Sequence, residues 1–212
     1  MKISILLSGI LALTMLVSSA AAKDDEIENM LKNPDFDDNI EGWTLGSLAD
    51  GAAGQLSLDK HGSSGLSRDN CLFARIDALG NDAWEPEIHS PSFDVELGET
   101  YTVSFWARTE EETITSVLVK FEQLDTWVGP SHTFNNLVTE EWQEFHFTTA
   151  MTMGSPPQVV LHITFVGTTD DIWFDHFRVY VGEYVEEDLG QPKISVMPMG
   201  RLATVWGQIK SR

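Results

Sequence analysis

Two glutamates in the stretch WEPEIHS, Glu85 and Glu87, have the residue type and spacing for acid–base chemistry. Two carboxylates held about 5–5.5 Å apart can cleave a glycosidic bond with retention, and two held about 6.5–9.5 Å apart can do so with inversion. Residues two apart on a strand point to the same face, so this pair could meet the shorter separation. Pro86 lies between them and lacks a backbone N–H, which favours an edge or a loop over a rigid central strand. Hydrolysis is therefore the less favoured interpretation of this pair.

No other motif in the chain predicts catalysis. There is no Gly-x-Ser-x-Gly elbow, no His-Glu-x-x-His, no Gly-x-Gly-x-x-Gly and no phosphate loop. The six histidines are scattered without a recognisable ligand spacing. The acidic run DFDDNIEGW (35–43) resembles an EF-hand loop at first, but its sixth position is Ile40 instead of glycine and its twelfth is Gly46 instead of glutamate. We therefore predict that the chain is not an enzyme and that this run is not an EF-hand.

The composition predicts an exported, acidic protein. Lys2, the apolar run 3–17 and the three alanines 20–22 form a signal-peptide pattern over residues 1–22. The apolar run is shorter than the roughly 20 residues that a membrane span needs, and no second run follows. The formal net charge of −20 excludes binding to nucleic-acid phosphates or to anionic lipid. We expect a secreted or periplasmic protein, cleaved near Ala22, with no nucleic-acid partner and no membrane span.

Short alternating runs separated by Gly, Pro, Asn and Asp predict strands rather than helices. In YTVSFWAR (101–108) apolar residues alternate with polar ones, and QVVLHITFV (158–166) places His162 and Thr164 on its wetter face. Seven or more such runs with no helix between them predict an all-β, antiparallel two-sheet sandwich over residues 23–185. The only cysteine, Cys71, lies in an apolar stretch and is expected to be a buried, inert thiol.

Four stretches of the chain follow one another as strand motifs: LKNPDFDDNIEGWTL, LGETYTVSFWART, LVTEEWQEFHFT and DIWFDHFRVY. In this order and spacing they resemble carbohydrate-binding modules of families four and nine, over about residues 30–182. The resemblance implies a galactose-binding-like jelly roll that binds sugar chains on a sheet face or at loop tips, without catalysis. It also implies that Phe36 and Trp43 pack in the core and that Gly42 serves a turn.

The same resemblance implies a structural calcium ion. Modules of this kind often hold calcium between an acid of the first strand and the aspartate of the closing strand, which here are Asp37 and Asp175. Calcium takes six to eight oxygen ligands and would relieve the repulsion between two carboxylates. Asp37 is one methylene shorter than the glutamate usual in the family. The alternative is that both aspartates cap turns or accept hydrogen bonds from backbone amides.

A saccharide site combines an aromatic platform for the apolar faces of sugar rings with polar side chains for the hydroxyls. The chain has seven tryptophans, more than a core of this size requires, and tryptophan is rarely fully buried. Trp84 and Trp127 are the predicted platforms, because they lie in stretches that resemble the ligand side of related modules. Trp106 is a third candidate on a strand that fits the other sheet. The predicted hydroxyl partners, each with a packing or surface role as the alternative, are Glu87, His89, Glu122 and Gln123.

The end of the chain differs from the body. Residues 191–212 contain four basic residues and no acid, and two prolines and two glycines precede the last basic stretch. Residues 186–212 are therefore predicted to be a linker and a basic tail, which could attach the protein to a surface. The predicted partner of the main domain is a polysaccharide or oligosaccharide. The alternatives are a structural or adhesive β-sandwich without a sugar site and, less favoured, a glycoside hydrolase.

Overall fold

The computed structural model describes residues 27–60, 70–109, 115–137, 140–155 and 158–187. The predicted signal segment 1–22 and residues 188–212 of the predicted tail lie outside these residues. The described residues form ten strands and no helix, which confirms the all-β prediction. Within the same residues, no helix is long and apolar enough to cross a membrane.

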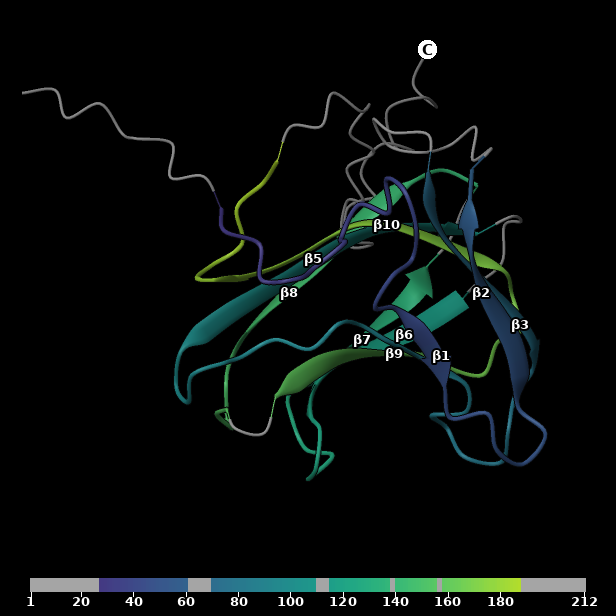
Figure 1. Cartoon of the computed structure of the whole chain (residues 1–212), viewed down its shortest axis with the longest axis horizontal. Coiled ribbons are helices and arrows are strands. Elements are labelled where there is room, and N and C mark those ends of the chain that lie inside the picture. Colours follow the sequence, from purple (N-terminus) through teal and green to yellow (C-terminus); the bar gives the residue numbers. More distant parts are fainter. Residues whose placement is uncertain (1–26, 61–69, 110–114, 138–139, 156–157, 188–212) are drawn as a thin grey trace, which may run out of the picture.

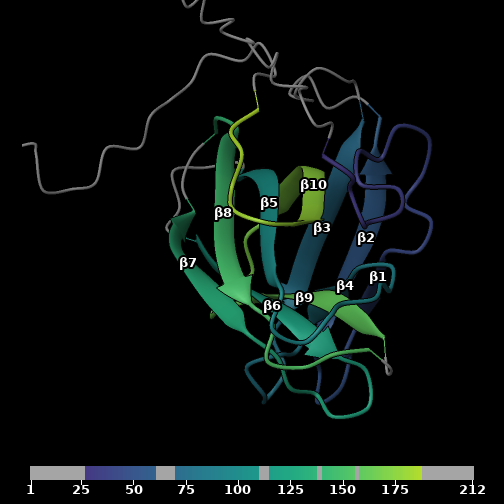
Figure 2. The same cartoon turned by 90° about the vertical axis from the view of Figure 1, so that its left-hand side faces the viewer.

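The ten strands form two antiparallel sheets that stack as two layers (Figures 1 and 2). One sheet, called the β9 sheet below, has the order β1-β4-β9-β6-β7, and the other, the β10 sheet, has the order β2-β3-β10-β5-β8. This is the predicted two-sheet sandwich of the jelly-roll type. The strands are β1 (Thr44–Gly46), β2 (Ala53–Asp59), β3 (Cys71–Ala78), β4 (Glu87–His89), β5 (Thr100–Thr109), β6 (Thr115–Gln123), β7 (Ser131–Leu137), β8 (Gln143–Ala150), β9 (Val159–Phe165) and β10 (Ile172–Val181).

The core lies between the sheets, where side chains from their inner faces meet. Phe105 of β5 in one sheet meets Phe134 of β7 in the other edge to face, with ring centroids 5.4 Å apart. Burying one such ring contributes on the order of 1.5–3 kcal/mol to folding. The inner face of β9 adds Val159, Leu161, Ile163 and Phe165, all buried.

Cys71, the first residue of β3, is sealed from solvent. Burial, reinforced by the nearby carboxylates of Asp59 and Asp175, raises the pKa of its thiol to about 12. The thiol therefore stays protonated at neutral pH, in agreement with the inert role expected from its apolar surroundings in the sequence.

The acidic segment near the start of the described chain packs into the core as a domain opening. Phe36 and Trp43 are buried and meet edge to face, with centroids 5.3 Å apart. The Trp43 indole N–H donates to the carbonyl of Asn33 at 3.1 Å. Gly42 has a φ of +86°, and a Cβ there would lie 2.8 Å from Cγ of Pro91. Glycine is required here both for the backbone conformation and for the close approach.

An ion cluster joins this opening segment to the residues that follow β10. His176 interrupts the β10 ladder at a bulge and adopts a φ of +50°. Its Nδ1 lies 2.6 Å from Oδ1 of Asp35, and its Nε2 lies 2.8 Å from Oε2 of Glu187. Arg178 lies 2.9 Å from the same Glu187 oxygen and 2.8 Å from Oε1 of Glu144 on β8. These ion pairs connect the two ends of the described chain across the β10 sheet.

Candidate functional site

A pocket of about 730 Å³ lies on the outer face of the β9 sheet, the face directed away from the core. Its volume is within the range of about 300–1,000 Å³ that is common for ligand sites. Along β6, Leu118, Lys120 and Glu122 line the pocket, whereas Val119 and Phe121 between them are buried in the core. This alternation follows from the period of two in a strand.

Strand pairing gathers the polar floor of the pocket from three strands. His89 of β4 is opposite His162 of β9, and His162 is opposite Lys120 of β6. In the adjacent row, Glu87 of β4 is opposite Thr164 of β9. Directly opposite side chains on one face have their Cβ atoms about 4.5–5.5 Å apart, so His89, His162 and Lys120 form a continuous polar strip. The second row continues from Thr164 to the apolar Leu118 of β6.

Two exposed tryptophans line the same pocket, Trp84 and Trp127. The side chains are 52% and 62% exposed, so each offers much of an indole ring to solvent. Trp84 precedes the first residue of β4, and Trp127 follows the last residue of β6. Both strands are antiparallel to β9 and hence parallel to each other. The two rings therefore approach the polar floor from opposite ends of the strands.

The loop that carries Trp127 holds this residue in an unusual conformation. Trp127 has a φ of +57°, a left-handed conformation that costs a non-glycine residue roughly 1–2 kcal/mol. The Trp127 N–H donates to the carbonyl of Gln123 at 2.9 Å. Lys120 Nζ donates to the carbonyl of Trp127 at 2.6 Å. Gly129 follows, where a Cβ would collide with the carbonyl of Phe121. Such retained strain is often found where a side chain must be presented to a ligand.

Glu87 is the most strongly perturbed acid of the pocket. Ser47 donates to its Oε1 at 2.7 Å, and His162 Nδ1 lies 3.1 Å from its Oε2. Burial alone would raise the pKa of Glu87, but its contacts with His162, His89 and Ser47 outweigh burial and lower the pKa to about 2. Glu87 is therefore a carboxylate at neutral pH and is unsuited to donate a proton as a general acid.

The second carboxylate of the floor, Glu122, is paired with a cation. Lys120 Nζ lies 2.5 Å from its Oε2, and His162 Nδ1 lies 3.1 Å from its Oε1. The floor thus carries two carboxylates, one ammonium group and two imidazoles within one connected network. Groups of this kind donate to and accept from the adjacent hydroxyls of a sugar ring.

The structure brings most of the predicted ligand residues together. Trp84, Glu87, Glu122 and Trp127 line the pocket, and His89 stacks on the pocket residue His162 with centroids 4.1 Å apart. The third tryptophan candidate, Trp106, is buried and belongs to β5 in the other sheet.

Gln123 is the predicted partner that the structure places elsewhere. It is buried, and its amide donates to the carbonyl of Gly154 at 2.8 Å and accepts from Thr126. Because Gln123 is adjacent to Glu122 on β6, its side chain points to the opposite face. Its hydrogen bonds to Gly154 and Thr126 fix the loop that carries Trp127, and they do not reach the pocket floor.

Sequence reasoning did not select three residues of the floor, His162, Lys120 and Thr164. The signal for two of them was present, because the alternation in QVVLHITFV placed His162 and Thr164 on the wetter face. What the sequence lacked was the pairing of β9 with β4 and β6, which brings these residues beside Glu87 and Glu122.

The two glutamates considered for hydrolysis have different surroundings. The Glu85 carboxylate accepts hydrogen bonds from the backbone N–H groups of Asn81 and Asp82, at 3.1 and 3.2 Å, and thus closes a turn before β4. Glu85 is outside the pocket lining, whereas Glu87 is part of it.

The two predicted calcium ligands lie in neighbouring segments. Asp175 of β10 is buried, and its Oδ1 accepts a hydrogen bond from the backbone N–H of His176 at 2.7 Å. A hydrogen bond from a backbone amide is the alternative to calcium binding for this aspartate. The segment around Asp37 runs beside this strand, because the Phe177 N–H donates to the carbonyl of Pro34 at 3.0 Å.

A stacked two-sheet jelly roll with a pocket on one outer face, two exposed indoles and a polar floor is the architecture of a carbohydrate-binding module, a class that binds sugars rather than transforming them. The sequence profile described as carbohydrate-binding domain, CBM_4_9, matches residues 28–169. The chain therefore belongs to this family, as the four strand motifs predicted. No curated protein matches the chain.

Solved structures of the same class share the fold. A CBM4 module superimposes with a TM-score of 0.56 at 25% identity, covering 72% of this chain and 99% of its own. TmCBM61, solved with β-1,4-galactotriose, has a TM-score of 0.51 at 17% identity over 73% of this chain and 99% of its own. The CBM22-1 xylan-binding domain from Paenibacillus barcinonensis has a TM-score of 0.51 at 13% identity over 71% of this chain and 93% of its own.

Proposed function

We propose that the pocket on the β9 sheet is the sugar site, and that it holds a polysaccharide or oligosaccharide between Trp84 and Trp127. The observation that carries this proposal is the position of two largely exposed indoles at opposite ends of one polar floor. Indole rings offer apolar faces to the CH groups of a sugar ring, while the floor binds hydroxyls. Exposed tryptophans without such a floor would favour the alternative of an adhesive surface.

The charge of the floor supports an uncharged glycan as the ligand. Glu87 is ionised at neutral pH, and the ammonium group of Lys120 is already paired with Glu122. The whole chain carries a formal charge of −20. A polymer of uronic acids would bring like charges next to these carboxylates, which costs free energy. We therefore propose neutral chains such as β-glucan, xylan or mannan as the ligand class.

A binding screen tests the proposed function. The full chain is titrated with β-glucan, xylan, mannan and a polyuronate while tryptophan fluorescence is followed, because Trp84 and Trp127 should change environment on binding. We expect a saturable shift with at least one neutral polymer and none with the polyuronate. No shift and no retardation in affinity gels across the panel would favour a structural role. Release of reducing sugar that is lost in Glu87→Gln would identify a hydrolase instead.

We also propose a structural calcium ion between the Asp37 segment and β10. Two acidic segments held side by side support it, since calcium binds carboxylates together with backbone carbonyl oxygens. Chelator is expected to lower the melting temperature, and calcium to restore it, because an ion bound only by the folded state stabilises that state. Asp37→Asn should melt at one temperature with or without chelator. A wild-type melting curve unchanged by chelator would contradict this proposal.

A further inference from the structure

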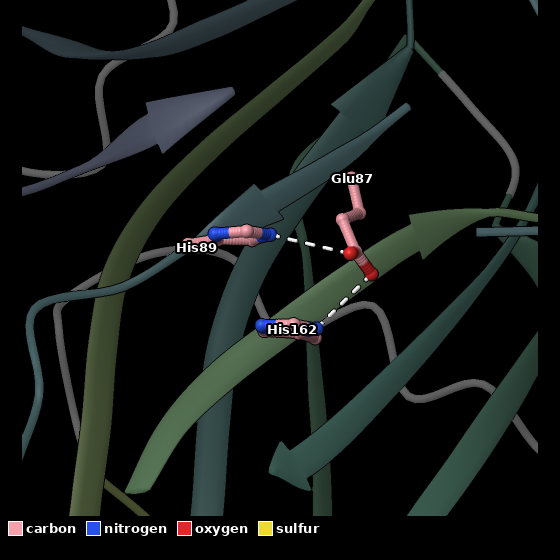
Figure 3. A group of neighbouring side chains, drawn as sticks. All are labelled: Glu87, His89 and His162. Carbon is pink, nitrogen blue, oxygen red and sulfur yellow. Dashed lines mark ion pairs between the residues drawn. The ribbon is translucent and has the colours of Figure 1, made fainter. Parts of the chain in front are cut away.

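Three side chains at the edge of the pocket floor form a compact cluster, Glu87, His89 and His162 (Figure 3). Each offers one ligand atom, and these atoms all lie within 4.8 Å of one another. His89 Nε2 lies 3.3 Å from Oε1 of Glu87, and His162 Nδ1 lies 3.1 Å from Oε2. Figure 3 shows that one nitrogen of each ring faces the same carboxylate.

The strand geometry suits a three-ligand metal site. Glu87 and His89 are two apart on β4 and share a face, and His162 of β9 is directly opposite His89. Two ligands at positions i and i+2 and a third across the ladder therefore converge on one point above the sheet. The rings are stacked in parallel, at an interplanar angle of 3°, with one nitrogen of each ring facing the Glu87 carboxylate (Figure 3).

The existing hydrogen bonds leave this cluster short of donors. The single Nδ1 of His162 lies 3.1 Å from both Glu87 and Glu122, yet it can give only one hydrogen to the two carboxylates. In the described part of the chain, His89 Nε2 is buried and makes no aligned hydrogen bond, although Oε1 of Glu87 lies 3.3 Å away. A cation among these atoms would satisfy the carboxylate oxygen and the imidazole lone pairs together.

We propose that Glu87, His89 and His162 bind a divalent transition-metal ion of the zinc type, through one carboxylate and two neutral imidazoles. Imidazole and carboxylate ligands suit zinc, and three protein ligands leave a coordination position open. Because Glu87 and His162 also line the pocket, the open position borders the pocket, where water or a sugar hydroxyl can occupy it. Since a bound cation changes the charge of the floor, the expected preference for a neutral glycan applies to the metal-free protein. This site is distinct from the calcium proposal, which concerns the other sheet.

His89 is fixed for this role by a glycine. A Cβ at Gly46 on β1 would lie 2.6 Å from Cε1 of His89, so the imidazole lies directly over the backbone of β1 on one side and against His162 on the other. A larger residue at position 46 would displace the ring without changing any of the three ligands. Gly46→Ala is therefore a variant that keeps the donor set and disturbs only its geometry.

Metal titration tests the proposal directly. The full chain, purified without a polyhistidine tag and freed of metal, is titrated calorimetrically with Zn²⁺ in excess Mg²⁺, which occupies weak sites among surface acids. We expect one Zn²⁺ per chain with micromolar or tighter affinity, and visible absorption from four- or five-coordinate Co²⁺ at the same site. His89→Gln, Glu87→Gln and Gly46→Ala should each weaken Zn²⁺ binding at least tenfold. His132→Gln, a histidine of the same sheet outside the cluster, should bind as the wild type does.

The outcomes separate this site from the sugar site. Circular dichroism establishes that each variant is folded. His89→Gln is the principal variant, because His89 is the least buried of the three ligands and its replacement disturbs the core least. No saturable Zn²⁺ binding by the wild type, or equal affinity in His89→Gln, would overturn the metal site. Because no glycan is present in this titration, either result leaves the glycan screen to be judged by itself.

Discussion

Trp84→Ala and Trp127→Ala are each expected to weaken binding of the recognised polysaccharide by roughly 30-fold, equivalent to about 2 kcal/mol of binding free energy. Both side chains are more than half exposed, so the free protein loses little stabilising contact when they are truncated. The loss should therefore appear in binding and hardly at all in folding. Since the two rings lie at opposite ends of the floor, the double variant should show no measurable binding.

Isothermal titration with soluble polymer or oligosaccharide measures these affinities, and thermal melting establishes that the variants are folded. Trp142→Ala is the matched control, because Trp142 is a tryptophan next to β8 in the other sheet, near Arg108. Trp127→Asn adds a second test, since asparagine tolerates the φ of +57° better than alanine does. It should lose binding as Trp127→Ala does while being the more stable of the two. Unchanged affinity in both Trp84→Ala and Trp127→Ala would show that the pocket is not the sugar site.

The fold could be predicted from the sequence because its elements depend on local patterns. The alternation in YTVSFWAR gives β5, and that in QVVLHITFV gives β9, close to the bounds in the structure. Phe36 and Trp43, assigned to the core by resemblance, are buried. Alternation is a property of a single strand, so it can be recognised in the sequence without knowing which strands are neighbours.

The site was only partly predictable because it depends on pairing between distant segments. His89 and His162 are 73 residues apart in the chain, and only the β4–β9 ladder stacks them. The histidines show no ligand spacing along the sequence, yet the ladder brings ligand atoms of Glu87, His89 and His162 within 4.8 Å of one another. For Gln123 the sequence was sufficient. It directly follows Glu122 on the same strand, so alternation alone places its side chain on the opposite face, where it is buried. Alternation along β6 therefore separates Gln123 from the pocket residues Lys120 and Glu122.

His176 and His146 are expected to change stability in opposite directions with pH. Burial would lower the pKa of His176, but its bonds to Asp35 and Glu187 outweigh this and raise the pKa above the usual 6.5. The stabilisation from protonated His176 is therefore fully present below about pH 6.5 and is lost as pH rises through the raised pKa. Hydrogen bonds to charged groups contribute about 1.5–3 kcal/mol. His176→Gln should lose about 2 kcal/mol of unfolding free energy near pH 6 and much less near pH 9.

His146 on β8 provides the contrasting case within the same sheet. Burial lowers its pKa, opposed by Glu144 and assisted by Arg178, and its ring stacks on Tyr184 with centroids 3.6 Å apart. A histidine with a lowered pKa stabilises the fold above its unfolded pKa and loses that contribution as pH falls. Urea unfolding of the two Gln variants near pH 6 and pH 9 separates the cases, because the deficit of His146→Gln should be larger at the higher pH. If both variants lost stability equally at the two pH values, neither imidazole would stabilise the fold through its charge. The contacts of His176 with Asp35 and Glu187 would then connect the two ends of the described residues through packing alone.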